Sequence, residues 1–477
     1  MYKFKLYQYS IALGACLAVA SCKVPVVATL AESKPIPPSY GNNQDTTNIS
    51  NMPLHEFFKD KNLVDLIDTA IKNNKELMIT LQDIEIAKSD IRVRKGALLP
   101  TVGLRAGLGV EKVGRYTSQG AGDASTEIAP GREFPDPLMD YTIAATANWE
   151  ADIWKKLRNS KKAAMSRYLS SIEGKNFVIT NLISEVAETY YELQSLDSQM
   201  DIVKQNIKLQ KNALEIVKVQ KEAMRTTELA VQKFQAEVLT STSMEFEILQ
   251  KIKEAENKIN FLLGRYPQDI PRDKGDFLAL VPSAVNAGIP AQLLANRPDI
   301  KQAELELAAA KLDVKVARAE FYPSLDISAA IGLQAFKPSY VFRLPESVLY
   351  SLAGDLAAPL INRNAIKAEF SSANARQLQA IFNYERVILN AYMEVSNHLS
   401  KISNLEKSYD LKSQQVKALN KSIEVSNDLF KSARADYFEV LMTQRDALES
   451  KLELIETKKE QLNAVVSVYR DLGGGWK

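Results

Sequence analysis

Two very long tracts without helix-breaking residues constrain this chain of 477 residues more than any other feature of its sequence. Between Trp154 and Leu263 the only glycine or proline is Gly174, and between Leu360 and Leu472 there is none. Helices of ordinary globular domains average about 11–12 residues. Apolar residues recur in both tracts at alternating spacings of three and four, which predicts one seam along a supercoiled helix. The tracts therefore predict long coiled-coil helices rather than a compact helical domain.

The two tracts are copies of each other. A shift of 209 residues carries Val186 to Val395 and Arg225 to Arg434. Upstream of each tract a shift of 223 residues applies, and it carries Pro100 to Pro323. The offset changes inside a loop region rich in glycine and proline, where insertions are well tolerated. An internal duplication is the economical explanation.

Four short segments switch from the helical period to an alternation of apolar with small or polar residues, which is typical of strands with unlike faces. They lie at about residues 101–111, 141–151, 324–334 and 348–358. Each is as long as a tilted strand that crosses a bilayer, with apolar side chains toward lipid and the others toward water. Because four strands cannot close a barrel and an open edge in lipid is very costly, several copies must associate. Two soluble hairpins packed on a core are the alternative interpretation.

The N-terminus is typical of a bacterial lipoprotein. Lys3 and Lys5 precede a short apolar stretch, and the residues Val-Ala-Ser before Cys22 resemble a lipobox. We predict a signal peptide over residues 1–21 and acylation of Cys22, which gives stable attachment when two or more chains are added. An ordinary signal peptide with a chance cysteine is the alternative. Residues 22–60, with several prolines, are predicted to form a lipid-anchored arm.

The composition excludes several classes of function. Lys and Arg number 60 against 58 Asp and Glu, so the chain lacks the basic footprint of a nucleic-acid-binding protein. Its only histidines are His55 and His398, and its only cysteines are Cys16 and Cys22, which argues against metal or thiol chemistry. No Gly-x-x-x-x-Gly-Lys-Ser/Thr phosphate loop occurs. We therefore predict no enzymatic activity, no cofactor and no metal site.

Six short motifs, occurring in a fixed order, resemble those of a known family. They are Trp149-Glu150-Ala151-Asp152-Ile153-Trp154, Leu262-Leu263-Gly264-Arg265-Tyr266-Pro267, Asn296-Arg297-Pro298-Asp299-Ile300, Ala317-Arg318-Ala319-Glu320-Phe321-Tyr322-Pro323-Ser324-Leu325, Ala433-Arg434-Ala435-Asp436-Tyr437-Phe438-Glu439-Val440-Leu441 and Tyr469-Arg470-Asp471-Leu472-Gly473-Gly474-Gly475-Trp476. Each motif alone is weak, but all six together are specific. Over nearly the whole mature chain the sequence resembles the TolC-like outer membrane efflux proteins, in the lipoprotein branch that contains OprM, CusC and NodT.

The resemblance implies a mixed α/β membrane protein. Each chain would supply four transmembrane β-strands and part of a long α-helical coiled-coil barrel, and a homotrimer would close a twelve-stranded β-barrel. The protein would lie in the outer membrane of a Gram-negative bacterium, lipid-anchored, and extend into the periplasm. The resemblance further implies a passive exit duct that is docked by a periplasmic adaptor protein and energised by an inner-membrane pump.

The repeats and motifs divide the mature chain into three further parts. We predict a first outer-membrane-efflux repeat over residues 61–267 and a second over residues 291–477, joined by a linker over residues 268–290. The four predicted strands fall inside the repeats, two in each.

Gating residues are predicted where each long tract turns back on itself, near Arg225 and Arg434. By resemblance, the second turn carries an acidic ring, to which Glu439 corresponds, whereas Met442 occupies the position where the family commonly has a second Asp. Arg434 and Asp436 are candidates for salt bridges that hold the tip shut, with Arg225 as the equivalent cation of the first repeat. The alternative is that these are solvated charges at helix ends, since exposed ion pairs contribute little.

Three functions remain open on the sequence alone. The leading hypothesis is an efflux outlet for small molecules, either drugs or metal ions, coupled to a proton-driven pump. The alternative is the outlet channel of an ATP-driven protein secretion system, which uses the same fold. A third possibility is a lipid-anchored coiled-coil scaffold that conducts nothing, and the four alternating segments argue against it.

Overall fold

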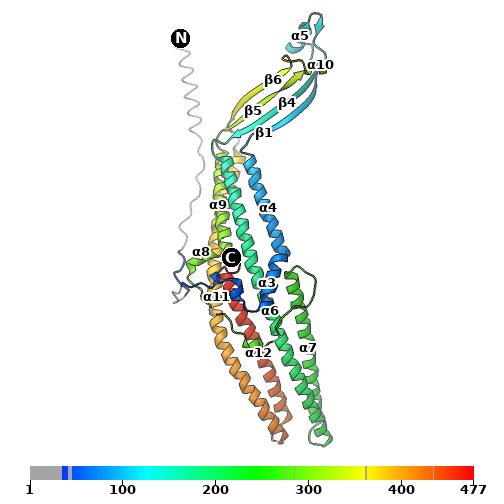
Figure 1. The fold of residues 1–477 in the computed structure, drawn as a ribbon, viewed down its shortest axis with the longest axis vertical. Helices are drawn as coiled ribbons and strands as arrows, with labels where there is room; N and C mark the ends of the chain where they lie inside the picture. Colours follow the sequence, from blue (N-terminus) through cyan, green and yellow to red (C-terminus); the bar gives the residue numbers. More distant parts are fainter. Residues whose placement is uncertain (1–34, 41–45, 274, 284, 360–362, 433) are drawn as a thin grey trace. The chain divides into compact units, whose positions relative to one another are not determined.

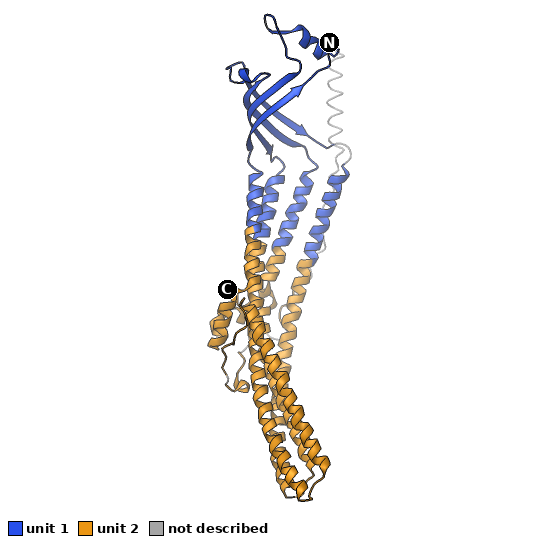
Figure 2. Ribbon diagram, turned by 90° about the vertical axis from the view of Figure 1, so that its right-hand side faces the viewer, with its two compact units in different colours: residues 1–31, 86–168, 305–382 blue, residues 32–85, 169–304, 383–477 orange. Residues whose placement is uncertain are grey.

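The computed structural model describes residues 35–40, 46–273, 275–283, 285–359, 363–432 and 434–477. The predicted signal peptide and Cys22 lie outside the described residues. Figure 2 colours two compact units. The described part of unit 1 comprises residues 86–168 and 305–382, and unit 2 contains residues 169–304 and 383–477 together with the described residues before 86. Each unit therefore draws on both predicted repeats.

Long helices dominate the chain, as the uninterrupted tracts predict. In the first repeat α4 (Lys75–Gly96) precedes the sheet, and α6 (Lys156–Glu222) and α7 (Glu228–Leu262) follow it. The equivalent helices of the second repeat are α9 (Pro298–Ala319), α11 (Asn364–Lys431) and α12 (Tyr437–Asp471). Helices α6 and α11 have 67 and 68 residues (Figure 1). In the described part of the chain no helix combines the length and the apolar character needed to span a membrane.

The remaining elements are short. The first group, before and beside the first hairpin, is η1 (Ile49–Asn51), α2 (Leu54–Phe57), α3 (Lys61–Asn73), α5 (Ser118–Ser125), β2 (Glu127–Ala129) and β3 (Arg132–Glu133). The second group is η2 (Phe277–Ala279), η3 (Pro290–Gln292), α8 (Leu293–Asn296) and α10 (Pro338–Val341). The sequence did not predict these elements, because all of them except α3 are runs of two to eight residues, which carry too little periodicity.

Unit 1 contains one antiparallel sheet of four strands. Its order is β1 (Thr101–Glu111), β4 (Leu138–Ala151), β5 (Ser324–Ala335) and β6 (Val348–Ala357) (Figure 1). These strands occupy the four segments whose alternation predicts them, and β4 begins three residues before the predicted 141. The central pairing, β4 with β5, joins the two repeats. The edge strands β1 and β6 have a partner on one side only within the chain.

The strand register gives the sheet two unlike faces. Leu104 is aligned with Ala145 of β4, then Ile331 of β5 and Tyr350 of β6. Large apolar residues of this face are widely exposed; they are Val102 71%, Leu104 90%, Leu108 65%, Ile331 63%, Tyr350 83%, Leu352 79% and Leu356 70%. One residue along, small and polar side chains line the opposite face, where Gly103 is aligned with Thr146, Ala330 and Ser351. Such a sheet suits lipid on one face and water on the other.

Aromatic contacts join the end of β4 to the residues just before its two neighbouring strands. The Trp154 ring stacks on Tyr322 with centroids 4.8 Å apart, and its indole N–H donates a 2.7 Å hydrogen bond to the Pro323 carbonyl. The indole of Trp149 donates to the Leu98 carbonyl at 3.1 Å. Both tryptophans thus connect the end of β4 to the chain just before a neighbouring strand.

The core of unit 2 follows the predicted seam of α6. Val186, Leu193 and Val203 are fully buried. They pack in one apolar cluster with residues of α3, α7 and α12. The N-terminal arm joins this cluster, since Phe57 stacks on Tyr469 with centroids 4.1 Å apart. Burial of these apolar side chains stabilises the long helices, because the intrinsic helix propensity of the residues contributes much less.

Candidate functional site

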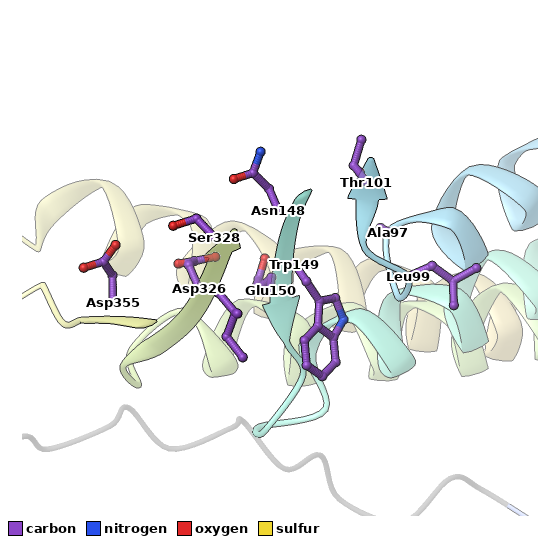
Figure 3. A pocket seen from close by; sticks show the side chains of 10 residues that line it. Ala97, Leu99, Thr101, Asn148, Trp149, Glu150, Asp326, Ser328 and Asp355 are labelled. Carbon is purple, nitrogen blue, oxygen red and sulfur yellow. The ribbon is translucent and has the colours of Figure 1, made fainter. Parts of the chain in front are cut away.

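Three carboxylates lie in one row on the polar face of the sheet. Glu150 of β4 is aligned with Asp326 of β5, which is aligned with Asp355 of β6. They line a cavity of about 250 Å³ (Figure 3). The Nζ atom of Lys156 lies 2.6 Å from Glu150 Oε1, so one of the three charges is compensated. Because like charges directly opposite each other repel, this row is unfavourable unless water solvates it.

The first helix turn connects α6 to α7 in unit 2. The amide of Arg225 donates to the Gln220 carbonyl at 2.8 Å, and Met224 adopts a left-handed conformation with φ of 53°. This arrangement ends α6 as a Schellman-type cap, usually with glycine at the left-handed position. Lys221 forms an ion pair with Glu228 across the turn. The hydrogen bond from Lys221 holds the pKa of Glu228 below its usual value.

The second helix turn connects α11 to α12 and carries most of the predicted gate residues. The amide of Arg434 donates to the Leu429 carbonyl at 2.9 Å, which is the equivalent of the bond from Arg225 to Gln220 in the first turn. Asp436 is the N-cap residue of α12, and its side chain makes no capping hydrogen bond. Glu439 lies in the first turn of α12, and its carboxylate is exposed. Met442 follows on the same helix and is half-buried.

The gate candidates are near their helix ends but do not pair with one another. Arg225, Arg434, Asp436 and Glu439 are exposed, and across the described residues none of them forms a salt bridge within the chain. The sequence missed the ion pair of Lys221 with Glu228, although the two residues flank the turn.

A buried arginine organises the middle of unit 2. Arg297, 5% exposed, donates hydrogen bonds to Asp299, to Glu394 of α11 at 2.9 Å and to the Asp471 carbonyl at 2.9 Å. Burial alone lowers the pKa of Arg297, but Asp299 and Glu394 raise it above its usual value. The nearby His398 Nδ1 lies 2.5 Å from Asp471 Oδ2, so this histidine forms a hydrogen bond between α11 and the C-terminal end of α12. Across the described residues no cluster of His, Cys, Asp or Glu is suited to a metal ion.

The two-faced sheet, the long coiled helices and the polar row define a channel subunit rather than a catalytic centre. Comparison with known proteins gives the same class. The family model described as "Outer membrane efflux protein" matches residues 66–265 and 289–474. The chain therefore belongs to the outer membrane efflux protein family, whose members are not enzymes.

Individual relatives match over nearly their whole length. The solvent efflux pump outer membrane protein SrpC of Pseudomonas putida is 26% identical, over 97% of this chain and 96% of the relative. The cation efflux system protein CusC of Escherichia coli O6:H1 is 26% identical over 93% and 94%. The probable outer membrane lipoprotein SilC of Salmonella typhimurium is 24% identical over the full length of both chains. A crystal structure of CusC superposes with a TM-score of 0.81 at 22% identity, over 95% of this chain and all of CusC.

These similarities confirm the predicted fold and location. The fold is that of the TolC-like channels. The protein is an outer membrane component of an efflux system and extends into the periplasm.

Proposed function

We propose that three copies of this chain form a passive exit duct across the outer membrane, which carries small molecules away from an inner-membrane pump. The sheet register is the observation that supports this role most directly. One face is apolar enough for lipid, the other offers small, polar and acidic groups to a water column, and the edges β1 and β6 leave room for the next copy. The acidic row favours passage of cations over anions.

The duct is proposed to need partners that supply energy, because its sequence contains no phosphate-binding loop for ATP. We propose that a periplasmic adaptor docks on the chain and that a proton-driven inner-membrane pump supplies the cargo. SrpC and CusC are named for solvent and cation efflux, so drugs, solvents and metal ions are the substrate classes to test. We further propose that residues 1–21 are removed and that Cys22 is then acylated. The mature chain would contain two repeats, over residues 61–267 and 291–477, and a linker over residues 268–290.

Capture of the cognate pump tests the role of the duct. The full-length chain, tagged at its C-terminus, is crosslinked in intact cells, purified and analysed by mass spectrometry. We expect a proton-driven pump and its adaptor to be recovered. Recovery of an ATP-binding transporter instead would replace the efflux role by the outlet of a protein secretion system. Absence of any pump would favour the third hypothesis, a lipid-anchored coiled-coil scaffold that conducts nothing.

We also propose that the helix turns form the gate. In a closed trimer, three copies of Arg225, Arg434, Asp436, Glu439 and Met442 would approach one another. Charged pairs between copies would hold the turns together, with Glu439 as a ring of carboxylates and Met442 as an apolar constriction. Among the described residues the four charged side chains have no salt-bridge partner, which is compatible with pairing between chains.

Removing the two turn arginines is expected to open the duct. The variant Arg225→Ala with Arg434→Ala loses both proposed cations, so single-channel conductance in planar bilayers should rise severalfold at the same voltage and salt. Lys221→Ala is the matched control, because it breaks an ion pair at the first turn that lies within one chain. Equal conductance of wild type and double variant, or an equal rise in Lys221→Ala, would disprove the arginine assignment.

A further inference from the structure

The duplication places two equivalent helices, α4 and α9, in different surroundings, and the residues compared below all lie in unit 1. On α9, Ala309 is fully buried, Val316 is half-buried, and Asp313 between them forms a salt bridge with Arg167 of α6. These residues share one helix face, because they are spaced by four and three positions. Helix α9 of the second repeat therefore uses this face to contact α6 of the first repeat.

In the described part of the chain the same face of α4 is exposed. The offset of 223 residues carries Ala309 to Ile86, Asp313 to Asp90 and Val316 to Val93. Ile86 is 66% exposed and Val93 is 67% exposed. Asp90 between them pairs with Arg94 one turn further along α4, at 3.3 Å, in a solvent-exposed pair of the kind that contributes little.

The long helix α11 carries the matching cation. The offset of 209 residues carries Arg167 of α6 to Arg376 of α11. The Arg376 side chain is 67% exposed and approaches Glu369 of its own helix at 3.7 Å, again an exposed pair. An arginine and an aspartate are thus conserved between the repeats, but only one of the two possible pairs is made within the chain.

The strands show the same asymmetry. In the repeat, β1 is equivalent to β5 and β4 is equivalent to β6. The pairing of β4 with β5 joins the repeats within one chain, so its equivalent is the pairing of β6 with β1 of the next copy. The contact of α6 with α9 likewise has its equivalent in a contact of α11 with α4 of the next copy.

We propose that Arg376 of one copy and Asp90 of the adjacent copy form a salt bridge, the counterpart between chains of the Arg167 and Asp313 pair. The occupant of the exposed α4 face is then a second copy of this chain, whose α11 covers Ile86 and Val93. Opposite charges face each other in this arrangement, and the two apolar side chains leave water. The inference rests on the trimer proposed above and assigns the residues of its helical interface.

Cysteine pairs test the assignment directly. Asp90→Cys with Arg376→Cys is treated in intact cells with a short thiol-to-thiol bismaleimide crosslinker. We expect covalent trimers on denaturing gels, because the two cysteines lie on different chains. The control Asp313→Cys with Arg167→Cys should stay monomeric after the same treatment, since that pair is made within one chain. Monomers from the first variant, with native trimers still present by mild-detergent size analysis, would overturn the pair but not the trimer.

Charge reversal gives a second measurement that does not depend on crosslinker reach. Asp90→Arg and Arg376→Asp, each alone, should lower the temperature at which trimers dissociate in detergent by a few degrees, because each change replaces an attraction by a repulsion at all three interfaces. The double reversal should restore most of that loss. If Asp90 matters only through Arg94, the double reversal keeps two arginines side by side and restores nothing, which would overturn the proposal. Wild-type protein without any trimer would instead contradict the proposed duct itself.

Discussion

Replacing Arg297 with alanine is expected to lower the free energy of unfolding by about 3–5 kcal/mol, the usual cost of removing one partner of a buried ion pair. The guanidinium satisfies Asp299, Glu394 and the Asp471 carbonyl. Without it, Asp299 and Glu394 stay partly buried and lose the guanidinium that compensates their charge. Thermal unfolding of the purified protein in detergent, followed by far-UV circular dichroism, measures the effect.

Arg470→Ala is the matched control for this substitution. Arg470 pairs with Asp471 at 2.9 Å, but its side chain is 30% exposed, so its loss should cost much less. An equal fall in melting temperature for the two variants would show that Arg297 is no more important than a partly exposed arginine.

Introducing arginine at Leu352 is expected to prevent most of the protein from assembling in the outer membrane. Leu352 lies in the middle of β6 on the apolar face and is 79% exposed, so lipid would surround the new charge. A lipid-facing arginine near the bilayer midplane costs about 2–4 kcal/mol in each chain. The amount of heat-resistant trimer in the outer membrane fraction measures assembly.

The neighbouring residue provides the control. Ser351→Arg adds the same side chain one position earlier, on the face that carries Thr146 and Ala330, where water can solvate it. We expect Ser351→Arg to assemble at close to wild-type amounts. If both variants assembled equally well, the assignment of lipid and water to the two faces would be wrong.

Periodicity explains which parts of the fold the sequence could predict. Alternation identified the four strands, and the spacing of apolar residues identified the seam of α6, whose members Val186 and Leu193 are buried. Both signals are local and repeat over many residues. The short helices α2 and α8 were missed, because four residues show no period.

The candidate site was predictable only in part, for a related reason. The sequence located the helix turns and their charges, because the duplication aligns Arg225 with Arg434. It did not reveal that Arg297 contacts Glu394, which is 97 positions away. A sequence shows which face of a helix a residue occupies, but the residue opposite that face depends on how distant segments pack.

The pairing of β4 with β5 has a consequence for assembly. Each chain joins two hairpins that, before duplication, would have belonged to separate half-length chains, so a ring of the same size would have needed six of them. Every association between free chains costs about 4–15 kcal/mol in lost translational and rotational freedom at the 1 M standard state. Assembling six free chains takes five associations and assembling three takes two, so the peptide linkage removes three of them and the duplicated chain closes its ring at a lower subunit concentration.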